Sequence, residues 1–99
     1  MVNHIVLWDF KAELSEQDKR EAAQRMQREL EGVKEQVSGV VSLKVVTSPL
    51  SSSNKEIGLI SVFESQEDLQ NYQGHPAHVA AGSFIKSVTE GRTCLDYEV

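Results

Sequence analysis

One stretch of the sequence reads Tyr72-Gln73-Gly74-His75-Pro76-Ala77-His78. Gly74 is suited to the positive φ with which many helices end at their C′ position. Pro76 keeps His75 out of helical geometry and is itself favoured as the first residue of a new helix. The stretch therefore predicts two helices that meet at a sharp corner, with Tyr72 on the last turn before it and His78 on the first turn after it.

Hydrophobic periodicity predicts the elements on either side of this corner. A long helix covers Glu16–Gln36, because a Ser-x-x-Asp cap at Ser15 precedes apolar residues at helical spacing. A similar cap at Ser65 begins the short helix before the corner, and the helix after it runs over residues 76–88. The predicted strands are Val2–Phe10, Val40–Thr47, Lys55–Glu64 and, after a break at Gly91, Arg92–Val99.

This β-α-β-β-α-β order is that of the ferredoxin-like fold, with the second helical segment broken at the corner. It predicts one four-stranded antiparallel sheet with helices on one face, in a single domain of residues 1–99. The other face still carries apolar side chains, among them Ile60 and Val62 of the third strand. Two copies packed sheet to sheet would cover this surface, so we expect a homodimer of the α+β-barrel type.

Composition excludes several kinds of partner. The net charge is −5, and the basic residues of the long helix are interleaved with acidic ones, so we expect no nucleic-acid partner. No apolar run approaches the roughly 20 residues of a membrane span and no secretory leader is evident, which predicts a cytoplasmic protein with no membrane partner. Cys94 is the only cysteine, and we expect it to be a small buried residue of the last strand.

Tyr72 and His78 are the candidate catalytic residues. The first turn of a helix disfavours the imidazolium, so we expect a low pKa for His78 and a neutral ring that could act as a general base. The hydroxyl of Tyr72 could hold a substrate carbonyl or the enolate formed from it. In the structural alternative, His78 caps a carbonyl or lines the core and Tyr72 packs its ring.

A small pocket is predicted beside this pair. If the even-numbered residues of the first strand face the helices, His4 shares a space with Tyr72 and His78. Apolar walls with a few polar groups are typical of small-molecule sites. In the alternative, His4 only makes hydrogen bonds at the end of the sheet and His75 is only a corner residue. The predicted pocket residues are His4, Val6, Trp8, Leu59, His75 and Ile85.

No metal or cofactor is predicted. His75 and His78 are three residues apart, but His75 lies outside the helix, so the two rings need not point together. The sequence contains no Cys-x-x-Cys, no His-Glu-x-x-His, no aspartate-rich calcium loop and no glycine-rich phosphate loop.

The chain resembles the stress-responsive A/B barrel family along nearly its whole length. The matching segments are Val2-Asn-His-Ile-Val-Leu-Trp8, Phe63-Glu-Ser65, Tyr72-x-x-His75-Pro-Ala-His78 and Asp96-Tyr97. The resemblance implies a dimeric α+β barrel. In a plant polyketide cyclase of this family the corresponding tyrosine and last histidine are catalytic, which implies such roles for Tyr72 and His78 and a pocket role for His4. Ile57 stands where that cyclase has another pocket histidine, so the two pockets differ. Magnesium is associated with some plant members, but this chain has no carboxylate cluster that would require it.

The sequence leaves three functions open. The first is a small homodimer that binds a small organic molecule in a largely apolar pocket. The second is a cofactor-independent enzyme acting on a carbonyl compound, with His78 as the base, Tyr72 as a donor on the oxyanion side and His4 as an orienting group. The third is a stress-protective protein whose pocket has no role.

Overall fold

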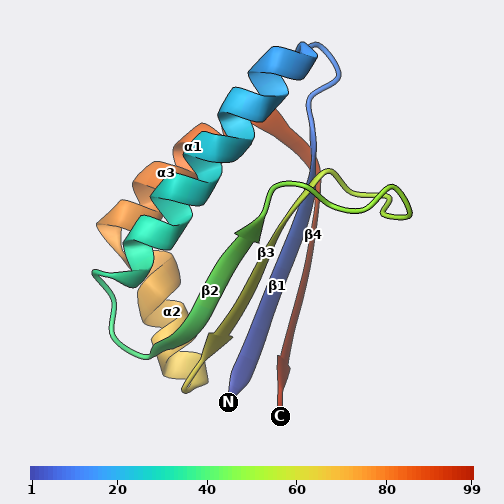
Figure 1. Cartoon of the computed structure of the whole chain (residues 1–99). Coiled ribbons are helices and arrows are strands. Elements are labelled where there is room, and N and C mark those ends of the chain that lie inside the picture. The colour runs from blue at the N-terminus through green and yellow to red at the C-terminus, as the bar shows by residue number, and fades with distance from the viewer.

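The structure is a computed structural model that describes residues 1–99. Its elements follow the predicted order, with two helices in the second helical segment (Figure 1). In chain order they are β1 (Val2–Phe10), α1 (Glu16–Lys34), β2 (Val40–Val46), β3 (Ile57–Phe63), α2 (Gln66–Gly74), α3 (Pro76–Val88) and β4 (Thr89–Glu98). The prediction of a ferredoxin-like fold is confirmed. None of the helices combines the length and apolar character needed to cross a membrane.

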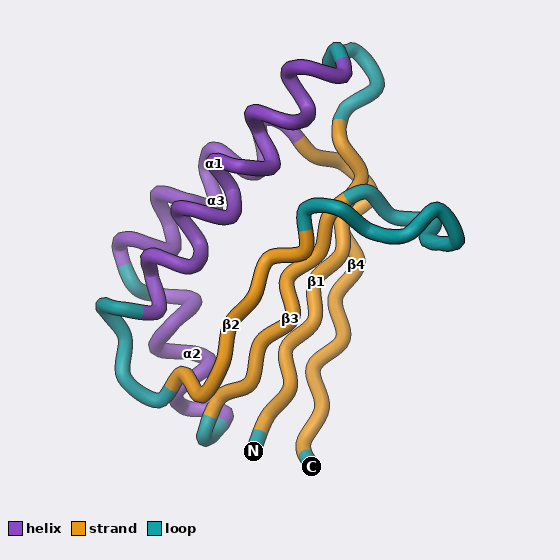
Figure 2. Tube along the Cα trace, viewed as in Figure 1, coloured by secondary structure: helices purple, strands orange, loops and turns teal.

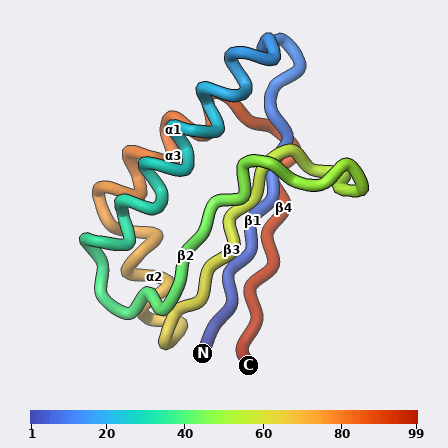
Figure 3. The backbone as a smooth tube through the Cα atoms, viewed as in Figure 1, coloured from blue at the N-terminus to red at the C-terminus, as the bar shows by residue number.

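The four strands form one antiparallel sheet in the order β2-β3-β1-β4, and the helices lie on one of its faces (Figure 2). β1 is an inner strand: its first residue, Val2, pairs with Phe63 of β3 and with Glu98 of β4. The two chain ends therefore lie side by side (Figure 3). There the Val99 N–H donates a hydrogen bond to the carbonyl oxygen of Met1 at 2.9 Å.

The core lies between the sheet and the helices. The even-numbered residues of β1 are buried and the odd-numbered residues after Val2 are half-buried, so the even face of this strand looks toward the helices. α1 begins at the predicted cap, where the Ser15 hydroxyl accepts a hydrogen bond from the Asp18 N–H at 3.1 Å. Its apolar stripe then packs onto the sheet through Ala22, Ala23, Met26, Leu30 and Val33.

The corner between α2 and α3 is made by His75 rather than by Gly74. Gly74 is the last residue of α2 and its φ is not positive, so the predicted left-handed helix end is wrong. His75 has φ −67° and ψ 137°, and its Nδ1 accepts a hydrogen bond from the Ala77 N–H at 3.1 Å. It therefore ends α2 and also caps α3. Pro76 begins α3 as predicted, and the restriction that proline places on the preceding residue is enough to turn the chain.

β4 begins earlier than predicted, and the break expected at Gly91 is wrong. Thr89 already pairs with Phe10, so the strand follows α3 directly. Gly91 lies inside the strand with φ +64°. The register between β1 and β4 shifts near this point, and a glycine with positive φ accommodates such a bulge.

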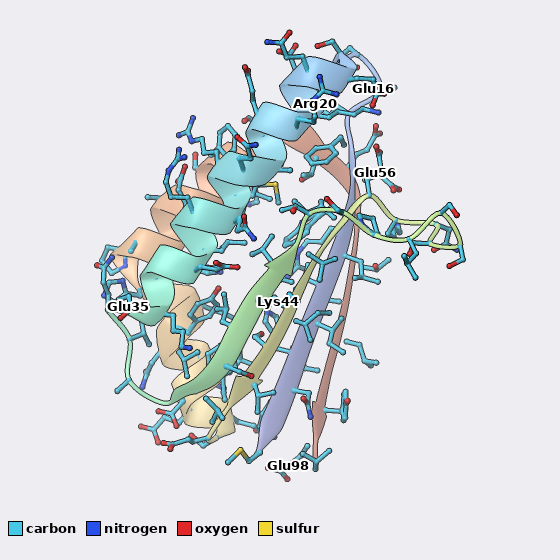
Figure 4. All side chains as sticks on the ribbon, viewed as in Figure 1. Glu16, Arg20, Glu35, Lys44, Glu56 and Glu98 are labelled. Atoms are coloured by element: carbon cyan, nitrogen blue, oxygen red, sulfur yellow. The ribbon has the colours of Figure 1, made fainter.

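The face of the sheet turned away from the helices carries no second layer of the chain (Figure 4). Ile60, Leu95 and Tyr97 on this face are 42%, 60% and 44% exposed. Ile5 of β1 pairs with both Ile60 and Leu95, so three apolar side chains form one row across the sheet. We refer to the surface formed by Ile5, Leu7, Ile60, Val62, Leu95 and Tyr97 as the free face.

Cys94 is exposed, so the prediction that it is buried is wrong. The physical reason is its place in the sheet rather than its own chemistry. β4 is an edge strand, and all of its residues after Thr89 are exposed. An apolar pattern in an edge strand does not tell whether another element covers it.

Candidate functional site

A cavity of about 400 Å³ lies between the inner strands of the sheet and the helices. This volume is within the range found for small-molecule sites. Its wall is formed by residues of β1, β3 and β4 and of all three helices. The residues that line it are His4, Val6, Trp8, Leu30, Leu59, Gln73, His78, Gly82, Ile85, Lys86 and Arg92.

The wall of this cavity is apolar at its depth and polar at its edge. Val6 and Trp8 of β1, Leu59 of β3, Leu30 of α1 and Ile85 of α3 are all buried. The other residues of the wall, apart from His4, are half-buried or exposed: Gln73, His78, Gly82, Lys86 and Arg92. A bound molecule would therefore place its apolar part against the sheet and its polar part near α3 and β4.

His4 is the polar group of the buried wall. It is 2% exposed, and its Nδ1 donates a hydrogen bond to a carboxylate oxygen of Asp96, the residue that pairs with it on β4. Because the carboxylate is the acceptor, the proton of this hydrogen bond is on Nδ1, and Nε2 is the other nitrogen available to a ligand. The two alternatives considered for His4 hold together: it makes a hydrogen bond within the sheet and it also lines the cavity.

His78 stands on the first turn of α3 and lines the same cavity. Burial lowers the pKa of its imidazole below the ordinary value of 6.5. A hydrogen bond to the backbone of Gln73 opposes this shift, while electrostatic repulsion from His4 and then from Arg92 adds to it. The ring is therefore neutral at physiological pH and can accept a proton or a hydrogen bond from a ligand.

Tyr72 lies behind His78 rather than in the cavity wall. Its ring centroid is 4.6 Å from that of His78 and 5.0 Å from that of Phe63. Tyr72 is 0% exposed, and its hydroxyl has no hydrogen-bond partner. Burial raises the pKa of this hydroxyl above its ordinary value of 10.0, so it stays protonated. The two corner residues are in contact, but only His78 reaches the cavity.

The structure places all but one of the predicted pocket residues in the cavity wall. Five of them line the cavity: His4, Val6, Trp8, Leu59 and Ile85. His75 does not, because its side chain is engaged as the cap of α3.

Sequence reasoning missed two charged residues of the wall, Lys86 and Arg92. Lys86 could have been found, because it follows His78 and Gly82 at steps of four residues and so continues the same stripe of the helix. Arg92 could not, since its position depends on the register between β4 and β1 and on the bulge in that pairing.

A cluster of metal-ligand types also lies at the edge of the sheet. The side chains of His4, Cys94 and Asp96 bring one ligand atom each to within 4.8 Å of one another. The Cys94 sulfur is 3.9 Å from Nδ1 of His4 and 3.6 Å from a carboxylate oxygen of Asp96. Desolvation and the adjacent carboxylate raise the pKa of the thiol, so Cys94 is protonated at neutral pH. With His4 already hydrogen-bonded to Asp96, this group is a hydrogen-bonded cluster as it stands.

The fold and the cavity together define a class of protein. It is a small α+β protein of the ferredoxin-like type, in which the inner strands of the sheet form the buried wall of a ligand-sized cavity. The chain belongs to the stress responsive A/B barrel domain family, whose model matches residues 2–99. The family indicated by the sequence motifs is therefore confirmed.

The proteins similar to this chain include one named enzyme and solved structures of unknown function. Olivetolic acid cyclase from Cannabis sativa is 33% identical over 100 residues, which cover 97% of this chain and 94% of that protein. A crystal structure of a protein from Bacteroides fragilis matches with a TM-score of 0.91 and 28% identity, over 99% of this chain and 95% of that chain. A protein from Thermobifida fusca has a TM-score of 0.83 and 15% identity, over 99% and 90% of the two chains. Both structures are described as dimeric, ferredoxin-like and of unknown function.

Proposed function

We propose that this protein is a homodimer of single-domain subunits, each formed by residues 1–99, and that each subunit binds a small organic molecule in its cavity. The observation that carries the proposal is the cavity of about 400 Å³ with buried apolar side chains at its depth. Such a site gains affinity by removing the apolar surface of a ligand from water. The few polar groups at its edge then fix the orientation of that ligand.

The imidazoles of His4 and His78 supply part of this orientation. The hydrogen bond to Asp96 occupies Nδ1 of His4 and leaves Nε2 for a ligand, and the neutral ring of His78 offers a further acceptor or donor. A hydroxyl or a carbonyl group on the ligand could therefore be recognised by two rings that come from β1 and α3.

The free face supports the homodimer. It exposes a row of apolar side chains from three strands, and exposed apolar patches of this kind mark interaction surfaces. A twofold pair of subunits would cover both copies of the surface at once. The two solved neighbours from Bacteroides fragilis and Thermobifida fusca are described as dimeric, which agrees with this arrangement.

Trp8 provides the measurement that tests ligand binding. It is the only tryptophan of the chain and lies in the buried wall, so its fluorescence should respond to a molecule in the cavity. We expect titration with octanol to give a saturable change in Trp8 emission. A side chain added at Gly82, which lines the cavity and has no atom within 4 Å of an added Cβ, should fill the space. The change should therefore be lost in Gly82→Leu.

The matched control is Gly32→Leu in α1, since Gly32 also has no atom within 4 Å of an added Cβ but does not line the cavity. This variant should respond to octanol as the unchanged protein does. If the unchanged protein gives no saturable response, or if Gly82→Leu responds equally, the cavity is not a binding site. A protective role that depends on the dimer alone would then be the better proposal for this protein.

A second candidate function is acid–base chemistry on a carbonyl compound, and the contact between Tyr72 and His78 favours it. His78 would be the base, and Tyr72, after a side-chain movement that exposes its hydroxyl, would stabilise the charge on the carbonyl oxygen. The similarity to olivetolic acid cyclase supports this alternative. The test is turnover of a linear β-polyketone, which should occur in the unchanged protein and be lost in His78→Ala with the fold retained. Absence of turnover in the unchanged protein favours a binding role.

A further inference from the structure

We propose that the ligand of this cavity is an organic acid, with an apolar body buried against the sheet and a carboxylate held at the edge between Lys86 and Arg92. The inference rests on the proposed binding function and specifies the chemical class of the ligand. It depends on the charges of the cavity wall, which differ in sign from the charge of the protein as a whole.

All the permanently charged side chains that line the cavity are positive. The chain has a net charge of −5, with 15 acidic residues against 10 lysines and arginines. Yet the cavity wall includes Lys86 and Arg92 and not a single aspartate or glutamate. A largely apolar cavity that is edged by cations alone, in a protein whose net charge is negative, is suited to a negatively charged ligand.

Neither cation is already neutralised by a partner. The ion pairs of the structure involve Lys19, Arg25, Lys55 and His4, and none of them includes Lys86 or Arg92. Both side chains belong to exposed residues, so they can move toward a ligand without losing an existing carboxylate partner. A carboxylate that arrives between them would gain charge-assisted hydrogen bonds, in which the guanidinium of Arg92 can act as a bidentate donor.

The two cations come from different elements. Lys86 lies on α3 and Arg92 on β4, so a group between them is held from both sides of the edge. Arg92 and His78 line the same cavity, so the guanidinium is on the same wall as the ring. Because the ring of His78 is neutral, the positive charge at the edge of the cavity comes from Lys86 and Arg92.

The carboxylate of Asp96 does not line this cavity. Asp96 lies beyond Cys94 on β4, and its carboxylate accepts the hydrogen bond from His4. It lines a separate hollow, which is formed with residues of α2. The depth of the cavity, by contrast, offers Val6, Trp8 and Leu59 to an apolar body. The ligand chemistry that matches both parts is an amphiphilic carboxylate.

Octanoate and octanol form a matched pair of probes, because they share the apolar chain and differ in the ionised head group. Binding of each is measured at neutral pH by Trp8 fluorescence and by calorimetry. We expect octanoate to bind about tenfold more tightly than octanol, because two partly exposed charge pairs can supply a difference in affinity of this size. In the double variant Lys86→Gln/Arg92→Gln the two affinities should differ by no more than about twofold, through weaker binding of octanoate alone. Arg92→Lys, which keeps the charge, should retain most of the preference.

The matched controls are Lys34→Gln and Arg28→Gln on α1, which remove the same charges from exposed positions outside the cavity. They should retain the preference for octanoate. Equal binding of octanoate and octanol to the unchanged protein would overturn the inference and leave the proposed binding function intact. An equal loss of preference in the controls would assign it to net charge rather than to the site, and would also overturn it. Absence of binding by both probes would overturn the proposed function itself.

Discussion

The ring of Tyr72 packs against the ring of His78 with a centroid distance of 4.6 Å, and the Tyr72 hydroxyl is buried without a hydrogen-bond partner. A buried polar group that lacks a partner destabilises the folded state, so its presence calls for a physical reason. Here the group lies directly behind a histidine of the cavity wall.

Replacing Tyr72 tests this cost directly. In Tyr72→Phe, the ring contacts remain and the unpartnered hydroxyl is removed. We expect the free energy of unfolding, measured in urea, to be unchanged or to rise by up to about 2 kcal/mol. Tyr97→Phe is the control, since Tyr97 is 44% exposed and its hydroxyl can reach water. A loss of stability in Tyr72→Phe would show that the hydroxyl has a partner in the folded protein.

The lowered pKa of His78 predicts how stability depends on pH. In the unfolded chain this histidine takes up a proton as the pH falls through about 6.5, whereas the folded protein resists protonation because the ring is buried. The unfolded state therefore binds more protons in this window, and the free energy of unfolding should fall as the pH drops below about 6.5.

Denaturant unfolding over a series of pH values measures this dependence. His78→Gln should reduce the slope below neutral pH. The control is His75→Asn, which keeps a side-chain acceptor for the Ala77 N–H and should retain the slope. An unchanged slope in His78→Gln would mean that another group is responsible.

The raised pKa of Tyr72 acts at the alkaline end. Above pH of about 10 the unfolded chain loses the phenolic proton, while the folded protein keeps it. The free energy of unfolding should therefore decrease as the pH rises through this region. Tyr72→Phe should abolish this part of the alkaline loss, and an equal loss in the variant would contradict the assignment.

Gly82 should be a position at which a small side chain stabilises the folded protein. It lies inside α3, and an added Cβ meets no atom within 4 Å. Gly82→Ala should raise the free energy of unfolding by about 0.4–1 kcal/mol, because alanine reduces the freedom of the unfolded chain and favours the helix. Urea unfolding measures this gain, and Gly32→Ala in α1 should give a similar one. A clear loss of stability at Gly82 alone would mean that the cavity wall cannot take even a methyl group.

The free face should control the assembly state. Leu95 is 60% exposed and pairs with Ile5 within the apolar row, so Leu95→Glu places a charge where a second copy would pack. We expect light scattering after size exclusion to give a dimer for the unchanged protein and a monomer for Leu95→Glu.

The control is Leu50→Glu, since Leu50 is 79% exposed but lies in the connection between β2 and β3. It should remain a dimer. A dimeric Leu95→Glu would move the interface away from the free face, and a monomeric unchanged protein would remove the dimer from the proposal.

The order of the elements could be predicted because each one carries a local signal. The caps at Ser15 and Ser65 accept hydrogen bonds from Asp18 and Asp68 as expected, and the alternation in β1 matches its buried and half-buried residues. The corner at Pro76 was likewise predictable from proline alone. Gly74 was misassigned because the extended conformation of His75 already ends the helix, which makes a left-handed residue unnecessary.

The properties that depend on neighbouring elements were not predictable in the same way. The exposure of Cys94 follows from the edge position of β4, and the bulge near Gly91 follows from its pairing with β1. The burial of Tyr72 behind His78 depends on how α2 and α3 pack together. Arg92 reaches the cavity wall only through the register of two strands that are far apart in the sequence.

β1 occupies an inner place in the sheet, and one of its two neighbours, β4, is synthesised after β1, β2 and β3. Val2 pairs with Glu98, so one side of β1 has no partner until β4 has been synthesised. Contacts between such distant residues form slowly, because a long loop must close before they are gained. The nascent sheet therefore reaches its full width only when β4 has been synthesised, and until then the open edge of β1 is the place where mispairing between newly made chains can begin.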